Sequence, residues 1–248
     1  MLNAYPWCIY CGQPATTVEH MPPRMMFLGK QRPKGLEFPT CDPCNQGTKH
    51  VDLVASLLSR TYPGPADEQG RHDLRNVLQA VGNNIPGLLD ELLVGKAGQK
   101  IARRHIPNMP AGAAVLRANG PLVTNHMKIF AAKFGFAMHY EAYGERVPAT
   151  GGAQSLWLSN VQAARGELPM EIIELLPARQ TLRQGAKEVS DQFEYSWQVT
   201  EDNKHSLAYA VFRSSFAIFA ATAVDQSEFL EKYADDLPVV RPGDFRSP

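Results

Sequence analysis

The sequence predicts an α+β protein in which a small zinc-stapled ββα module precedes a larger domain of helices and an antiparallel sheet. Two cysteine pairs lie within the first 50 residues, a long apolar helical stripe lies near the middle of the chain, and a strictly alternating segment lies near its end. We place the first module at residues 1–60. Residues 61–248 form the second unit, to which the sequence assigns no role, and the sequence YPGP (62–65) breaks the chain between them.

The composition is typical of a globular protein and argues against several classes. Of the 248 residues, 44% are hydrophobic and 20% are charged, and the formal net charge is zero, so an overall basic footprint for nucleic acid is absent. Residues 1–60 carry six Lys/Arg against four acids, and residues 187–240 carry ten acids against four bases. We see no signal peptide and no apolar run of about 18 residues, so we expect a cytoplasmic protein without a membrane span. Residues 61–248 are where a second copy or a protein partner would bind.

All four cysteines fall into two CxxC pairs, Cys8 with Cys11 and Cys41 with Cys44. Each CxxC turn can present two thiolates to one side of a zinc ion, so two turns complete a tetrahedron. A reducing cytosol disfavours disulfides, and neither pair lies in the βαβ pattern of a redox motif. We therefore predict a structural Zn²⁺ with no open position for substrate. Free thiols or a redox pair are the alternatives.

Between the pairs the sequence predicts a hairpin, and after them a helix. TVEH (17–20) fits a short strand, the two prolines that follow prevent a regular helix, and LEFP (36–39) fits the return strand. Asn45 is a residue type that caps helices, and apolar residues recur at helical spacing from there to about residue 60. A zinc ion that straps the hairpin to this helix brings Glu19 and His20 opposite Asn45.

The spacing of apolar residues predicts the remaining helices and strands. Helical patterns cover 71–84, 85–95, 122–140 and 225–237, and the third of these is apolar on two sides, which predicts burial between neighbours. Residues 144–154 are expected to form a loop. The alternation in QFEYSWQVT (192–200) predicts a half-buried strand, and 201–204 a turn. Residues 206–224 fit one or two further strands or a buried helix, and we favour an antiparallel meander.

The order of these residues resembles the HNH endonucleases, whose nuclease core is the ββα-metal fold. The resemblance covers about 50 residues and is carried by Cys8, Cys11, Glu19, His20, Pro22, Cys41, Cys44, Asn45 and Lys49. It implies that His20 is the general base, and that Glu19 and Asn45 hold a divalent metal at the scissile phosphate. The implied activity is metal-dependent hydrolysis of phosphodiester bonds in nucleic acid, with DNA as the expected partner.

Chemistry supports these roles independently. An imidazole with a pKa near 6.5 can accept a proton from water at neutral pH. A hard cation held by the carboxylate of Glu19 and the amide oxygen of Asn45 keeps positions open for water and phosphate, so we expect Mg²⁺, or Mn²⁺ in its place. Adjacent strand residues point to opposite faces, so a bulge or the strand's end must turn Glu19 and His20 the same way.

The sequence departs from the family where an asparagine normally braces the hairpin and the base. Leu36 or Glu37 occupies that position, so Thr40 or a backbone carbonyl would have to orient His20, or activity is weakened or lost. The alternative function is a catalytically degenerate zinc-binding module that binds nucleic acid or a protein. Other candidate phosphate contacts are the basic residues Arg24, Lys30, Arg32, Lys34, Lys49, Arg103 and Arg104, with His105. His50 is a further candidate ligand.

Overall fold

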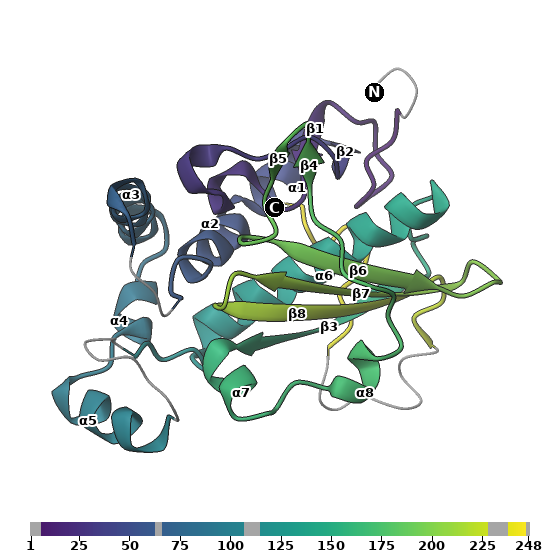
Figure 1. The fold of residues 1–248 in the computed structure, drawn as a ribbon. Helices are drawn as coiled ribbons and strands as arrows, with labels where there is room; N and C mark the ends of the chain where they lie inside the picture. Colours follow the sequence, from purple (N-terminus) through teal and green to yellow (C-terminus); the bar gives the residue numbers. More distant parts are fainter. Residues whose placement is uncertain (1–5, 63–65, 107–114, 228–237, 247–248) are drawn as a thin grey trace.

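The second half of the chain forms a four-stranded antiparallel sheet. The computed structural model describes residues 6–62, 66–106, 115–227 and 238–246. The strands are β3 (Gly152–Ser159), β6 (Glu194–Val199), β7 (His205–Phe212) and β8 (Phe216–Ala223), in the order β3-β8-β7-β6 (Figure 1). The α+β class and the predicted meander are confirmed, and the ambiguous segment 206–224 is two strands joined by a tight turn.

The expected loop at 144–154 is wrong at its end, because β3 begins at Gly152. Along its whole length β3 pairs with β8. Gly152 is required there by close approach: a Cβ on this residue would lie 2.4 Å from the Val239 side chain. The glycines that suggested a loop therefore mark the edge of a strand that another segment covers.

Helix α6 (Pro121–Tyr143) crosses one face of the sheet, as Figure 1 shows, and confirms the predicted buried helix. Phe130 makes edge-to-face contacts with Phe212 and Phe216 of the sheet, and these rings are buried. At Gly135 the helix approaches β8 so closely that a Cβ would lie 2.6 Å from the Cβ of Ala220. The apolar cover on two sides of α6 follows from this position between the sheet and the front of the chain.

The front of the chain forms the predicted hairpin and a helix in two parts. Strand β1 (Thr17–His20) pairs antiparallel with β2 (Glu37–Thr40), and helices α1 (Asp42–Gly47) and α2 (Lys49–Leu58) follow. Two short 3₁₀ turns, η1 (Arg24–Met26) and η2 (Leu28–Lys30), lie in the connecting loop. The expectation that Asn45 opens the helix is wrong, because Cys41 is the N-cap and Asn45 lies inside α1.

Smaller elements surround the sheet, α6 and the front of the chain. Helices α3 (Glu68–Asn84) and α4 (Leu88–Leu92) match the patterns at 71–84 and 85–95. Helix α5 (Lys96–His105), α7 (Asn160–Ala164), α8 (Met170–Ile173) and the two-residue strands β4 (Arg183–Gln184) and β5 (Lys187–Glu188) complete the fold. Most of the expected helix 225–237, residues 228–237, lies outside the described residues. Among the described helices, none has the length and apolar character required to cross a membrane.

One hydrophobic core joins the front of the chain to the sheet. Helix α2 packs against α6, and the C-terminal segment returns to the front, where Gly243 N donates to Tyr10 O over 2.9 Å. The ring of Phe245 contacts both Tyr10 and Phe136. The division at residue 60 stays a prediction, and the core that crosses it ties the stability of the front to the rest of the molecule.

Candidate functional site

The four cysteines converge at the base of the hairpin. Their sulfur atoms all lie within 4.8 Å of one another, and Cys11 Sγ is 3.5 Å from Cys41 Sγ. Zinc–thiolate bonds of about 2.3 Å in a tetrahedron place sulfurs about 3.8 Å apart, so the quartet has the dimensions of a zinc site. Cys8, Cys41 and Cys44 are buried, and Cys11 is partly exposed. The residues therefore fit the predicted structural Zn²⁺.

The thiols of the quartet differ in their acid–base properties. A hydrogen bond from Cys44 lowers the pKa of Cys8 to about 4, whereas burial raises that of Cys11 to about 11. A zinc ion supplies the positive charge that lets all four ionise, and its binding would release protons.

His20 ends β1 on the partly exposed side of the hairpin. Its Nε2 lies 2.9 Å from Arg24 Nη2 and 3.8 Å from the Oε1 of Glu37, its cross-strand partner. An arginine is only a donor, so Nε2 accepts and the imidazole is neutral with its proton on Nδ1. Burial lowers the pKa of His20, and the nearby Arg24 and Arg32 lower it further. The ring is therefore in its basic form at neutral pH.

The loop after His20 is held by Arg32. Its guanidinium donates to the carbonyl oxygens of Met21, Pro22, Pro33, Gly35 and Leu36 over 2.7–3.2 Å. These bonds close the loop that carries Arg24. Arg32 thus shapes the site as a clamp, its contact with a nucleic-acid backbone stays a prediction, and Arg24, Lys30 and Lys34 remain exposed.

Glu19 does not share a site with His20, which corrects the expectation of a common metal. Glu19 is 4% exposed and faces the core, where its Oε2 lies 3.2 Å from Lys133 Nζ of α6. Oε2 accepts no hydrogen bond from the described residues, so Lys133 is its charge partner alone. No bulge turns the strand, so the two neighbours obey the alternation of a strand and point to opposite faces.

Lys133 is the cation that Glu19 contacts, and it is shared with Asp52 of α2. Lys133 is fully buried, and its Nζ donates to both carboxylate oxygens of Asp52 over 2.8 and 2.9 Å. An ammonium group therefore stands between the two buried carboxylates. A Mg²⁺ or Mn²⁺ ion at Glu19 does not fit, because Lys133 occupies the coordination space. With both acids ionised the cluster carries one excess negative charge.

The Glu19–Asp52–Lys133 cluster makes stability depend on pH. Burial raises the pKa of Asp52 from 3.8 to about 7, against the opposing pull of Lys133. The folded state then holds a proton that the unfolded state has lost between these values, so the unfolding free energy falls as pH rises from about 4 to about 7. We expect Asp52→Asn to remove this fall in the unfolding free energy. The stability of the variant relative to the wild type should therefore increase from about pH 4 to about pH 7. Urea titrations at several pH values measure the difference, and a constant difference would contradict the assignment.

The other predicted site residues are scattered around the front. Asn45 is half-buried on α1 with its backbone in the helix, and Lys49 is exposed at the start of α2. His50 is half-buried, and burial lowers its pKa. Thr40 is buried beside Cys8 Sγ at 3.5 Å, so it belongs to the zinc site and does not orient His20. Glu37 lies opposite His20 across the hairpin.

Comparison with known proteins adds no assignment: no family model, no curated protein and no solved structure matches the chain.

Proposed function

We propose that the zinc-stapled front of the chain is an HNH-like module that hydrolyses phosphodiester bonds in nucleic acid, with His20 as the general base. The arrangement of His20 between Arg24 and Glu37 carries the proposal. It combines a neutral imidazole, a guanidinium that can bind phosphate and a carboxylate that can stabilise the imidazolium that forms.

Arg24 has two roles in the proposed reaction. In the free protein its guanidinium donates to His20 Nε2, the atom that must accept a proton from the attacking water. A phosphate group that enters the site competes for the guanidinium and draws it from the ring. Substrate binding thereby frees the base and places a positive charge beside the phosphate, where negative charge develops in the transition state.

Mg²⁺ or Mn²⁺ stays part of the proposal as the ion of the reaction, but not at Glu19. The carboxylate that faces His20 is Glu37, and Asn45 is the amide that the family resemblance assigns to the ion. Substitution of Glu37 and of Asn45, each with a titration of Mg²⁺, tests which of them lies near the ion.

His20→Ala is expected to lower the rate of nicking of a supercoiled plasmid about 10²–10⁴-fold, the usual contribution of a general base. The assay uses zinc-loaded protein with Mg²⁺ or Mn²⁺, and His72→Ala, which changes an exposed histidine on α3, is the matched control. Because the pKa of His20 is lowered, the wild-type rate is expected to have reached its plateau by pH 7. Equal nicking by the wild type and His20→Ala would contradict the role of His20.

A second function, binding without hydrolysis, is favoured by the Lys133 contact. Glu19 is withdrawn into the core, and no asparagine braces the hairpin, so the module lacks two features of the family. DNA binding with no cleavage by the wild type under any divalent ion would select this function.

A further inference from the structure

The middle of the chain contains a long segment of one charge sign. Residues 92–140 include seven Lys/Arg and no Asp or Glu, although the whole chain has equal numbers of acids and bases. The exposed cations among the described residues of this segment gather on α5 and just after it, at Lys96, Lys100, Arg103, Arg104 and Arg117. A local field of this kind attracts anions independently of the net charge.

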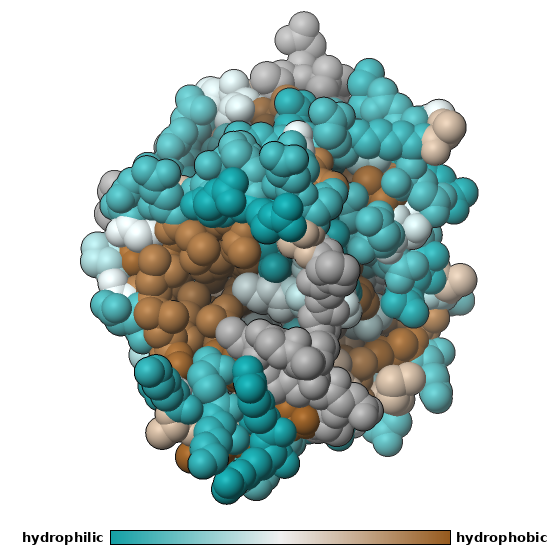
Figure 2. All heavy atoms as spheres, turned by 60° about the vertical axis from the view of Figure 1, so that its left-hand side comes forward, coloured by the Kyte–Doolittle hydropathy of each residue, from teal (hydrophilic) through white to brown (hydrophobic). Residues whose placement is uncertain are grey.

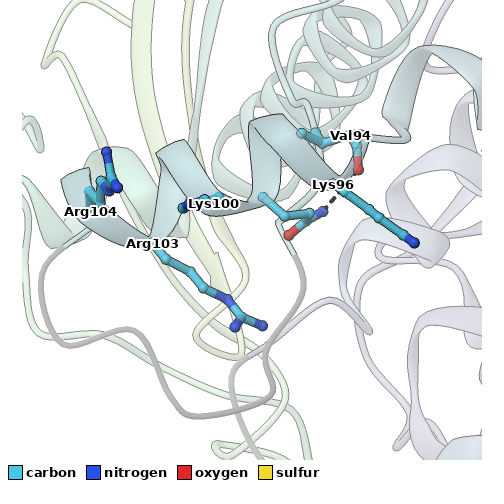
Figure 3. A pocket seen from close by; sticks show the side chains of 6 residues that line it. Val94, Lys96, Lys100, Arg103 and Arg104 are labelled. Atoms are coloured by element: carbon cyan, nitrogen blue, oxygen red, sulfur yellow. Dashed lines mark hydrogen bonds between the residues drawn. The ribbon is translucent and has the colours of Figure 1, made fainter.

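Helix α5 presents its cations along one side. Lys96, Lys100, Arg103 and Arg104 follow helical spacing that keeps them within about a third of the circumference. Together with Val94 and Gln99 they line an open depression of about 510 Å³ (Figure 3). None of the α5 residues is buried, so no buried apolar face holds the helix against the rest of the protein.

The helix is fixed at its base by Gln99. Its side-chain amide donates to the carbonyl oxygens of Val94 (3.2 Å) and Val115 (2.7 Å), and its carbonyl accepts from Val115 N over 2.8 Å. Arg117 N also donates to Leu92 O over 2.8 Å. These bonds tie Leu92 and Val94 to Val115 and Arg117 and orient the first turns of α5.

Phosphates of a nucleic acid fit this surface better than a lipid membrane does. A helix that lies on a membrane needs a wide apolar face, and on α5 Ile101 is the one large apolar side chain that is exposed. In Figure 2 the lowest part of the molecule, at the height of α5 in Figure 1, is mainly hydrophilic, and a wide apolar patch lies directly above it. Four cations one helical turn or less apart suit the regular charges of a nucleic-acid backbone.

We propose that α5 is a second contact site for the nucleic-acid backbone, separate from the His20 site. The choice of nucleic acid as the partner rests on the proposed function. In Figure 1 α5 and β1 lie at opposite ends of the molecule, so a strand or duplex that contacts both runs along the side of the protein. Contacts at α5 then add affinity and leave the chemical step unchanged.

The test compares two triple variants in the full-length, zinc-loaded chain carrying His20→Ala, so that the DNA stays intact. The first variant is Lys96→Gln, Lys100→Gln and Arg104→Gln. The matched control is Arg165→Gln, Arg179→Gln and Lys204→Gln, which removes the same charge from exposed positions elsewhere. Binding of a duplex of about 30 base pairs is measured by fluorescence anisotropy from about 50 to 200 mM salt. Three lost phosphate contacts reduce the salt slope by about 2.7, so the affinity of the control is expected to fall about 40-fold more than that of the α5 variant.

Equal salt slopes for the two triple variants, or no DNA binding by the parent chain, would overturn the inference. So would a stronger effect of the α5 variant on binding to vesicles with anionic headgroups than on binding to DNA. Nicking by the chain with His20 intact is measured separately at saturating DNA. Nicking that persists while the slopes are equal leaves the proposed function standing, and unequal slopes without nicking leave the α5 site standing.

Discussion

Cys44→Ser is expected to abolish zinc binding and to lower the melting temperature by about 10–20 °C. Cys44 is fully buried in the first turn of α1, and its loss leaves three thiols that cannot close the tetrahedron. The apparent binding free energy of a structural zinc is about 10–16 kcal/mol in isolated zinc fingers. The loss of stability is expected to be smaller here, because packing against α6 also holds the front of the chain in its fold. A net loss of about 5 kcal/mol corresponds to this shift in a chain of this size.

Metal analysis and thermal unfolding measure the effect together. One zinc ion per wild-type chain is expected, and removal of the ion with a chelator should reproduce the instability of Cys44→Ser. Zinc added back should restore the wild type and not the variant. A purified wild-type chain that contains no zinc, or that unfolds at the same temperature after chelation under reducing conditions, would contradict the site.

The front of the chain was predictable from its sequence because its constraints are local or few. Two CxxC pairs require one cluster of sulfurs, and two short β-patterns between them can pair in one way, so the hairpin and the quartet follow. The orientation of Glu19 was not predictable in the same way. The sequence does not specify which face of β1 is buried. Helix α6, which lies more than 100 residues later in the chain, packs on the face that carries Glu19 and buries it.

A signal for the buried cluster was present in the sequence. Asp52 interrupts the apolar face of a helix, and Lys133 lies in a helix that is apolar on two sides. Charged residues are almost never buried unless they are paired, so each of these positions predicts a partner of opposite sign. Which acid pairs with which base depends on the packing of α2 against α6. The periodicity of apolar residues in the sequence does not determine which two helices pack together.

Lys133→Met is expected to lower the unfolding free energy by about 3–5 kcal/mol. The methionine fits the volume of the lysine stem, but the substitution leaves Glu19 and Asp52 together in the core without a cation. Removal of one partner from a buried ion cluster costs about this much, because the remaining charge must be protonated or hydrated. The loss should be larger at pH 8 than at pH 5, where the two carboxyls of the variant can hold protons.

Two further variants separate charge from packing. Lys128→Met changes a half-buried lysine on the same helix and is expected to alter stability by less than about 1 kcal/mol. The triple variant Glu19→Gln, Asp52→Asn, Lys133→Met removes every charge of the cluster, and a large part of the stability lost in Lys133→Met should return. If the triple variant is as unstable as Lys133→Met at both pH values, the lost stability comes from altered packing and not from uncompensated charge. If it recovers, the instability of Lys133→Met comes from the two uncompensated acids, and the ammonium of Lys133 balances the charge of Glu19 and Asp52 in the core.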